Sequence, residues 1–183
     1  HGLNFHETFG ERGYITKART EGQRDMGPCP SPCNAFLFVQ GLETLHLRME
    51  RHSENAQRVA EFLAADERVS FVNYPGLATS PYYDLGQKYL SQGQSSVFSF
   101  GVKGGYEAAV KFIEGLEIHS HLANVGDAKS LIIHPASTTH AQLTQEDMKA
   151  GKITPELLRI SVGIEHIDDI LWDLDCGLTT ATK

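Results

Sequence analysis

The sequence predicts an α+β fold: a small, mostly antiparallel sheet with helices on one face, entered by one long connecting helix. A helix is expected over residues 34–65, because this stretch has no proline and turns from apolar all round to amphipathic. From residue 66 onward, stretches with the period-2 pattern of strands alternate with amphipathic helical stretches. We therefore expect a first segment, residues 1–65, that leads into a C-terminal domain, residues 66–183.

The first segment begins irregularly. One short helix is expected at residues 15–26, and it should end at Gly27, just before three closely spaced prolines. Asn34 then occupies a good N-cap position for the long helix.

Five stretches in the second segment have the composition and alternation of strands. They are residues 69–74, 96–102, 117–122, 130–134 and 157–164. Apolar stripes predict two helices, at residues 106–116 and 167–178, the second with Asp168 and Asp169 in its first turn, where the helix dipole favours acids. A shorter helix is expected between a cap at Thr144 and a stop at Gly151.

Composition limits the classes of function. Apolar residues make up 40% of the chain and charged residues 21%, as in soluble globular proteins, and the net charge of -7 argues against nucleic-acid or anionic-membrane partners. No apolar run approaches the roughly 18 residues of a membrane span. No secretory signal is visible, so a cytoplasmic location is expected. Because the chain starts at His1 and not at Met, we expect it to be a processed or truncated piece of a longer protein.

Metal and redox sites are weakly supported. Three cysteines at irregular spacing form no disulfide framework, and Cys29 and Cys33 have no further metal ligands close in sequence. His119 and His121 alternate onto one strand face, but no acid or third histidine lies near them. A surface or buried histidine pair is therefore favoured over a metal site.

The last predicted strand carries an unusual arginine. Apolar residues fill one face from Leu158 to Ile164, whereas the other face has Arg159 followed by the small residues Ser161 and Gly163. A half-buried guanidinium must pair with an acid or face a polar ligand. The small neighbours would leave room for a carboxylate held by two parallel hydrogen bonds. Spacing alone favours the alternative, a structural arginine paired with an acid elsewhere in the fold.

A second candidate stretch is NVGDAKSLIIHPASTTH, residues 124–140, in which hydroxyl groups and one histidine surround a short apolar strand. The polar side chains are Ser130, Ser137, Thr138, Thr139 and His140. Taken alone, the stretch is more typical of an ordinary strand with polar loops.

Together these pieces resemble a known family. The segments NAFLFVQGLETLHLRMERHSENAQRVAEFL, NYPGL, SLIIHPASTTH and LLRISVGIEHIDDILWDL are similar, in this order, to the C-terminal part of the pyridoxal-phosphate-dependent (PLP-dependent) enzymes of cysteine and methionine metabolism. HGLNF, YITK, NVGDAKSL and HPASTTH are most similar to the O-acetylhomoserine sulfhydrylase branch, and Lys129 stands where the cystathionine lyase branch usually has an acid. The resemblance implies the aspartate aminotransferase-like fold, with residues 1–65 as the tail of the PLP-binding domain plus the connecting helix, and residues 66–183 as the small domain.

The resemblance also implies roles for three residues. Arg159 matches the arginine that holds the α-carboxylate of the amino-acid substrate, Ser130 matches a serine of the same carboxylate site, and Thr139 matches a threonine near the substrate. The family's cofactor is PLP, held by a lysine that this chain lacks. Lys17 in YITKA resembles that lysine motif superficially but comes well after it in the family, and no other lysine has a suitable context. We therefore expect no catalytic, cofactor-binding or metal-binding residue here, and the N-terminal half or more of the parent enzyme to be absent.

The function that the resemblance implies is γ-replacement in methionine and cysteine biosynthesis: O-acetylhomoserine and sulfide, or a thiol, would give homocysteine and acetate. The parent enzyme is expected to be a homotetramer. Two alternatives stay open. The parent could belong to the cystathionine γ-synthase, cystathionine γ-lyase or methionine γ-lyase branch, or this chain could be a non-catalytic domain, inactive without the missing half.

Overall fold

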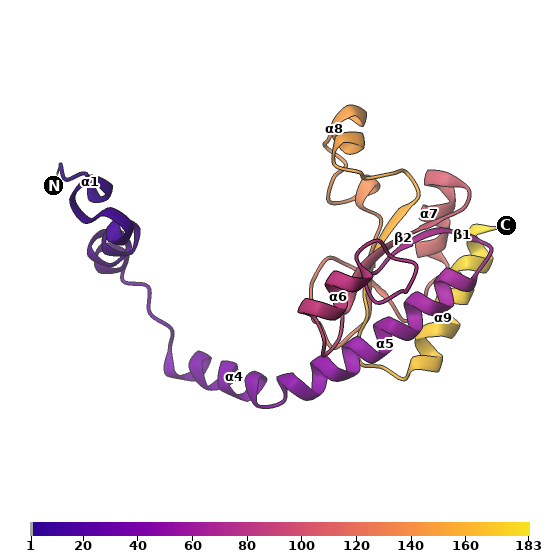
Figure 1. Ribbon diagram of the computed structural model, residues 1–183, viewed down its shortest axis with the longest axis horizontal. Coiled ribbons are helices and arrows are strands. Elements are labelled where there is room, and N and C mark those ends of the chain that lie inside the picture. The colour runs from indigo at the N-terminus through magenta and orange to yellow at the C-terminus, as the bar shows by residue number, and fades with distance from the viewer. Residues whose placement is uncertain (1) are drawn as a thin grey trace. The chain divides into compact units, whose positions relative to one another are not determined.

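The computed structural model describes residues 2–183, which fall into two compact units with the boundary between Glu43 and Thr44 (Figure 1). Among its described residues, the first unit contains helices and no strand. Its elements are α1 (Phe5–Phe9), η1 (Gly10–Arg12), α2 (Gly13–Lys17), the π-helical η2 (Ala18–Gln23), α3 (Arg24–Met26) and α4 (Pro32–Glu43). As expected, the helical run over residues 13–26 stops at Gly27, which has a left-handed backbone with φ of 62°.

The prediction of one continuous helix over residues 34–65 is wrong. The chain forms α4 and then α5 (Leu45–Ala65), and Thr44 between them leaves the helical conformation with φ of -108° and ψ of 7°. A glycine at position 41 and a β-branched residue at position 44 both weaken a helix at this point. The predicted cap is also wrong, because Ser31 and not Asn34 caps α4. The Ser31 hydroxyl accepts the Asn34 N–H at 3.1 Å, and Pro32 suits the first helical position.

The second unit contains a five-stranded sheet in the order β1-β2-β5-β4-β3. The strands are β1 (Val69–Asn73), β2 (Val97–Val102), β3 (Ser120–His121), β4 (Leu131–Ile133) and β5 (Leu157–Ser161). Each lies within a predicted stretch. Only the β3–β4 pair is parallel, so the sheet is mostly antiparallel, as the sequence predicts.

The remaining elements are α6 (Tyr83–Tyr89), α7 (Gly105–Glu114), η3 (Pro135–Ser137), α8 (Gln145–Ala150) and α9 (Ile167–Ala181). The predicted cap of α8 is confirmed, since the Thr144 hydroxyl accepts the Asp147 N–H at 3.1 Å. Helix α6 was not predicted.

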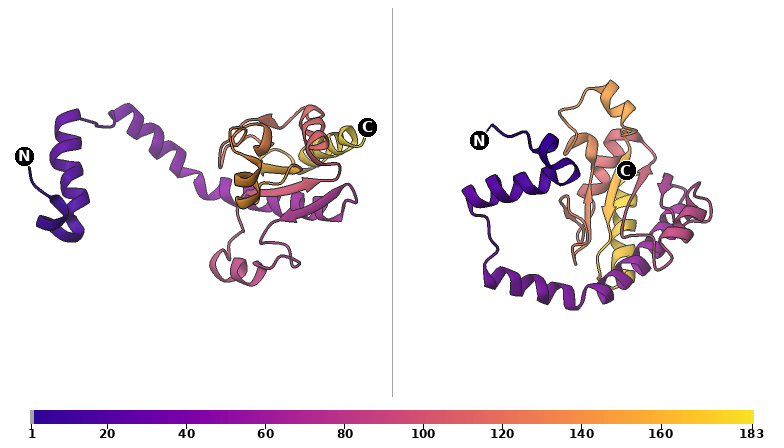
Figure 2. Two further views of the ribbon diagram at one scale, coloured as in Figure 1. Left: turned by 90° about the horizontal axis from the view of Figure 1, so that it is seen from above. Right: turned by 60° about the vertical axis from the view of Figure 1, so that its left-hand side comes forward.

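Helices α5, α7 and α9 pack on one face of the sheet, which confirms the α+β class (Figure 2). Phe100, Leu158 and Ile160 project from the central strands into this core and are fully buried. Because α5 packs against β1 and α9, it lies in the second compact unit. The domain boundary between residues 65 and 66 refers to the complete enzyme and stays a prediction.

Candidate functional site

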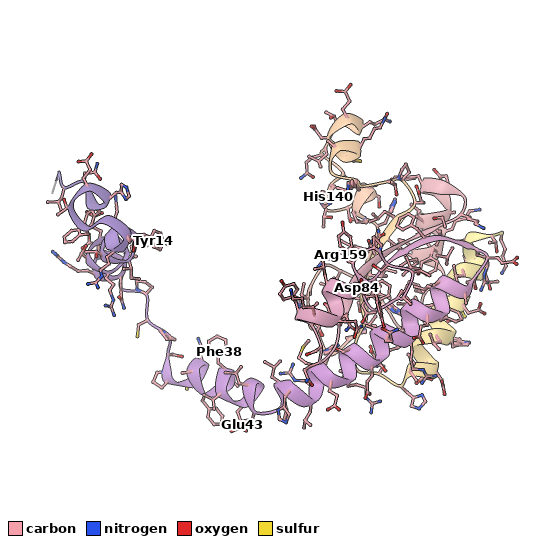
Figure 3. All side chains as sticks on the ribbon, in the orientation of Figure 1. Tyr14, Phe38, Glu43, Asp84, His140 and Arg159 are labelled. Atoms are coloured by element: carbon pink, nitrogen blue, oxygen red, sulfur yellow. The ribbon has the colours of Figure 1, made fainter. Side chains whose placement is uncertain are left out.

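Arg159 lies in the middle of the sheet, opposite Ser99 of β2 and Ile133 of β4 (Figure 3). Since its neighbours Leu158 and Ile160 are core residues, its side chain projects from the other face, which α5, α7 and α9 do not cover. The guanidinium is partly exposed, and its Nη2 lies 3.5 Å from the carbonyl oxygen of Asn124. Among residues 2–183, no acid forms an ion pair with Arg159. The structure therefore does not support the alternative of a structural arginine paired with an acid of this chain. Its fork of donors is available to a carboxylate.

The small residues after Arg159 do not leave open space, contrary to the interpretation from the sequence. A Cβ atom at Gly163 would lie 2.5 Å from both the Ala128 carbonyl oxygen and the Ser130 nitrogen. Ser161 is only 3% exposed, and its hydroxyl has no hydrogen-bond partner within the described chain. The segment that leads into β4 therefore packs directly on the end of β5, and Gly163 is small because backbone approaches it.

Ser130 is fully buried where this segment meets β5. Its backbone N–H donates to Glu165 Oε1 at 2.7 Å, and its hydroxyl donates to Glu165 Oε2 at 2.9 Å. The same hydroxyl oxygen accepts the Gly163 N–H at 2.8 Å. The single hydroxyl hydrogen of Ser130 is thus already used in the hydrogen bond to Glu165.

Thr139 lies in an exposed loop after η3, and its hydroxyl is 2.8 Å from Nδ1 of His140. In the described part of the chain, no hydrogen bond joins any two of Arg159, Ser130 and Thr139. Ser130 immediately precedes β4 and lies three residues before Ile133, the residue opposite Arg159, which corresponds to about 10 Å along the strand direction.

The polar side chains that support the end of β5 were not predicted from the sequence. Asn55 on α5 donates to the carbonyl oxygens of Gly163 and Glu165, each at 3.0 Å. Nδ1 of His52, one turn earlier, lies 2.6 Å from the carbonyl oxygen of Val162. Both side chains are buried, and their signal in the sequence was two polar residues on the helical stripe that otherwise carries Ala56 and other core residues.

The two strand histidines do not form a pair. His119 is buried, with Nδ1 2.6 Å from Asp173 Oδ2 of α9, whereas His121 is exposed. Asp173 also accepts the backbone N–H groups of Glu117 and His119. Burial raises the pKa of Asp173, but the hydrogen bonds from the His119 side chain and from these backbone groups outweigh it and lower the pKa to about 2.

Lysine, histidine, cysteine and acidic side chains are the groups of the described residues that could hold a cofactor or a metal ion. All eight lysines of the chain are exposed, and Lys17 forms an ion pair with Glu21 at 3.7 Å. A lysine that holds PLP must lie in a site that also binds the ring and the phosphate. Residues 2–183 contain no cluster of histidine, cysteine or acidic side chains suited to a metal ion. No helix in that range is both long and apolar enough to cross a bilayer.

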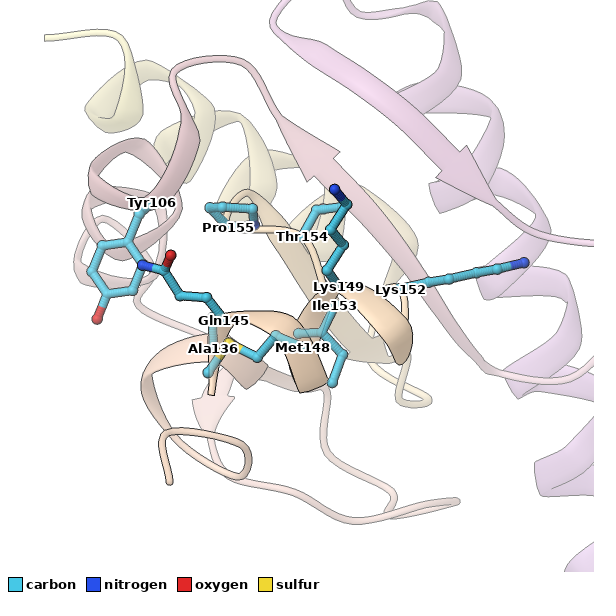
Figure 4. A pocket seen from close by; sticks show the side chains of 9 residues that line it. All are labelled: Tyr106, Ala136, Gln145, Met148, Lys149, Lys152, Ile153, Thr154 and Pro155. Atoms are coloured by element: carbon cyan, nitrogen blue, oxygen red, sulfur yellow. The ribbon is translucent and has the colours of Figure 1, made fainter. Parts of the chain in front are cut away.

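A pocket of about 500 Å³ lies beside α8 (Figure 4). Its lining is mostly apolar and includes Tyr106, Met148 and Ile153, with Lys149 as a charged member. None of the three predicted site residues lines it.

Comparisons with known proteins agree with the resemblance. A family model described as Cys/Met metabolism PLP-dependent enzyme matches residues 10–179. The O-acetyl-L-homoserine sulfhydrylase of Leptospira meyeri is 53% identical, in an alignment that covers 97% of this chain and 42% of the relative. O-acetyl-L-homoserine sulfhydrylase 1 of Thermus thermophilus is 49% identical, covering 95% of this chain and 41% of the relative. The chain thus spans about two fifths of the length of these relatives.

Solved structures show the same similarity. A putative O-acetylhomoserine (thiol)-lyase from Campylobacter jejuni, which carries N′-pyridoxyl-lysine-5′-monophosphate, matches with a TM-score of 0.84 and 41% identity, over 98% of this chain and 42% of that one. Yeast cystathionine γ-lyase matches with a TM-score of 0.82 and 42% identity, over 88% of this chain and 42% of that one. The predicted fold, a C-terminal part of a PLP-dependent enzyme, is confirmed.

Proposed function

The chain belongs to the family of Cys/Met metabolism PLP-dependent enzymes, and from that premise we propose that it is the C-terminal part of an O-acetylhomoserine sulfhydrylase. In this reaction the γ-acetate group of O-acetylhomoserine is replaced by sulfide or a thiol, and homocysteine and acetate are the products with sulfide. The names of relatives at 53% and 49% identity support this branch of the family. The single structural observation that carries the proposal is Arg159, a partly exposed guanidinium with no acid paired to it in the described chain.

Arg159 would hold the α-carboxylate of the amino-acid substrate. A guanidinium offers two parallel donors in one plane, so it fixes both the position and the orientation of a carboxylate. Orientation matters for this reaction, because a misplacement of about 1 Å can lower a rate about a hundredfold. The strand that carries Arg159 is anchored in the core on both sides by Leu158 and Ile160, so the guanidinium starts from a rigid support.

PLP, when bound, would supply an electron sink for negative charge next to the α-carbon of the amino acid. No lysine of this chain matches the family's cofactor-lysine motif and all eight are exposed, so we assign none of them as its covalent holder. The role that we assign to this chain is therefore to bind and orient the substrate.

We propose further features of the complete enzyme on the same basis. Ser130 and Thr139 would belong to the surroundings of the substrate, residues 1–65 to the tail of the PLP-binding domain with the connecting helices, and residues 66–183 to the small domain. The enzyme would be a cytoplasmic homotetramer.

The test is product analysis of the complete enzyme that contains this chain. With O-acetylhomoserine and sulfide, we expect homocysteine and acetate in equal amounts. A second candidate, the cystathionine γ-lyase branch, is favoured by the TM-score of 0.82 to the yeast enzyme. Cleavage of cystathionine without any homocysteine formation from O-acetylhomoserine would establish that branch and contradict the proposal. Activity with neither substrate would favour a non-catalytic role.

A further inference from the structure

Glu165 connects the end of β5 to the loop that faces Arg159. Both of its carboxylate oxygens are occupied by Ser130, one by the backbone N–H at 2.7 Å and one by the hydroxyl at 2.9 Å. The main chain adds a third link, because the Ile164 N–H donates to the Ala128 carbonyl oxygen at 2.9 Å. These bonds fix residues 128–130 relative to β5.

The loop ahead of these residues, 122–127, is largely exposed and forms no strand or helix. At its far end, the Asn124 carbonyl oxygen lies 3.5 Å from Nη2 of Arg159. The loop is also linked to Lys129, whose N–H donates to Asp127 Oδ1 at 3.1 Å, and within itself, since the Val125 N–H donates to Asn124 Oδ1 at 2.9 Å. The Asn124 side-chain amide also donates to Asp127 Oδ2 at 3.4 Å, so the Asp127 carboxylate connects Lys129 to Asn124.

The bonding of Ser130 decides how this serine can act. Its hydroxyl donates a hydrogen bond to Glu165, and its oxygen accepts one from the Gly163 N–H. A donor that is already used cannot also donate to a substrate carboxylate. Ser130 therefore acts through Glu165 and the loop, and not as a direct ligand of the substrate.

We propose that Glu165 is a positioning residue for the substrate-binding Arg159: its carboxylate holds Ser130, and so holds the loop whose Asn124 carbonyl orients the guanidinium. Asn55 supports the arrangement from behind by donating to the carbonyl oxygens of Gly163 and Glu165. This inference rests on the proposed function, because it assumes that Arg159 binds a substrate carboxylate.

The test uses the preference of the complete enzyme for a carboxylate. The measured quantity is the ratio of kcat/KM for O-acetylhomoserine to kcat/KM for its neutral α-carboxamide. A variant that is partly unfolded loses both activities equally, so the ratio does not change with the folded fraction. Loss of orientation at Arg159 lowers the ratio, since only the charged substrate uses the guanidinium.

We expect Glu165→Ala to lower the ratio by about tenfold, and Glu165→Gln, which keeps one acceptor oxygen, to lower it less. Ser130→Ala should lower the ratio, and the double variant Ser130→Ala/Glu165→Ala should lose no more than Glu165→Ala alone, because the two act as one unit. The matched control is Glu114→Ala, an exposed glutamate on α7 that should leave the ratio unchanged.

An unchanged ratio in both Glu165 variants, with a collapsed ratio in Arg159→Ala, would overturn the positioning role. So would additive losses from Ser130→Ala and Glu165→Ala. If Glu165→Ala does not fold, Glu165→Gln decides the question by the same ratio. If the wild type turns over cystathionine and not O-acetylhomoserine, the proposed function fails, and the same ratio with cystathionine and its α-carboxamide still tests Glu165.

Discussion

Replacing Asp173 by asparagine should destabilise the second compact unit strongly. Asp173 is fully buried on α9 and accepts three hydrogen bonds, from the backbone N–H groups of Glu117 at 2.6 Å and His119 at 3.0 Å and from the His119 ring at 2.6 Å. It thereby ties the segment between α7 and β3 to α9.

The magnitude follows from these bonds. In Asp173→Asn one carboxylate oxygen becomes an NH₂ group, which must face at least one of the donors and cannot accept its hydrogen. Each hydrogen bond to a charged group contributes about 1.5–3 kcal/mol, and a buried donor left without a partner costs about as much. We expect a loss of about 3 kcal/mol in the free energy of unfolding, or roughly 6–12 °C in Tm for a chain of this length.

The pH dependence has a definite sign. The pKa of Asp173 is lowered in the folded state from 3.8 to about 2, so its contribution is fully present above about pH 4 and is lost as the pH falls toward 2. The shift corresponds to about 2 kcal/mol, of which roughly half should be lost by pH 3. Asparagine does not titrate, so the difference between wild type and Asp173→Asn should narrow between pH 5 and pH 3.

The assay is urea unfolding of this chain, followed by circular dichroism at pH 7, 5 and 3. The matched control is Asp175→Asn on the same helix, whose side chain is 55% exposed and pairs with Arg68, and which should cost no more than about 1 kcal/mol. If Asp173→Asn cost no more than Asp175→Asn, or if its loss did not depend on pH, the reasoning would be refuted.

Two further predictions concern the chain itself. Gly163→Ala should destabilise it by several kcal/mol, because the new Cβ would lie 2.5 Å from the Ala128 oxygen and the Ser130 nitrogen. The control, Gly151→Ala, should have a mild effect, because its nearest atom is at 3.4 Å and its backbone is not left-handed. Equal unfolding midpoints of the two variants in urea would contradict this prediction. Incubation with PLP, followed by borohydride and peptide mapping, should give partial labelling spread over several lysines and none labelled in a one-to-one ratio, because all eight are similarly exposed and none matches the cofactor-lysine motif. One-to-one labelling at Lys17 would show that the chain holds the cofactor alone.

The sequence predicts the sheet well because its strands alternate strongly and have one core face. Leu158 and Ile160 make β5 recognisable, and they also predict that Arg159 lies on the opposite face. The break at Thr44 was not predicted, since one glycine and one threonine in a 32-residue helical pattern are weak local signals. Capping was predicted correctly at Thr144, where the acid three residues later supports the cap.

The site was predictable only in part, because its contacts join distant segments. Ser130 and Glu165 are 35 residues apart, and no local pattern predicts that the Glu165 carboxylate accepts a hydrogen bond from the Ser130 hydroxyl. A glycine at position 163 could leave room for a ligand or for a closely approaching backbone segment. Only the structure shows that the backbone of residues 128–130 occupies this space. What the sequence does predict is the residue type that a carboxylate needs, on the face where the core helices do not lie.

The central claim, that Arg159 binds the substrate carboxylate of an O-acetylhomoserine sulfhydrylase, is tested most directly by steady-state kinetics of Arg159→Ala and Arg159→Lys in the complete enzyme. Loss of the paired charge should cost about 3 kcal/mol of transition-state stabilisation, or on the order of a hundredfold in kcat/KM for O-acetylhomoserine with sulfide. Lysine should restore only part of this, because it keeps the charge and loses the planar fork. A near-normal kcat/KM in Arg159→Ala would contradict the account.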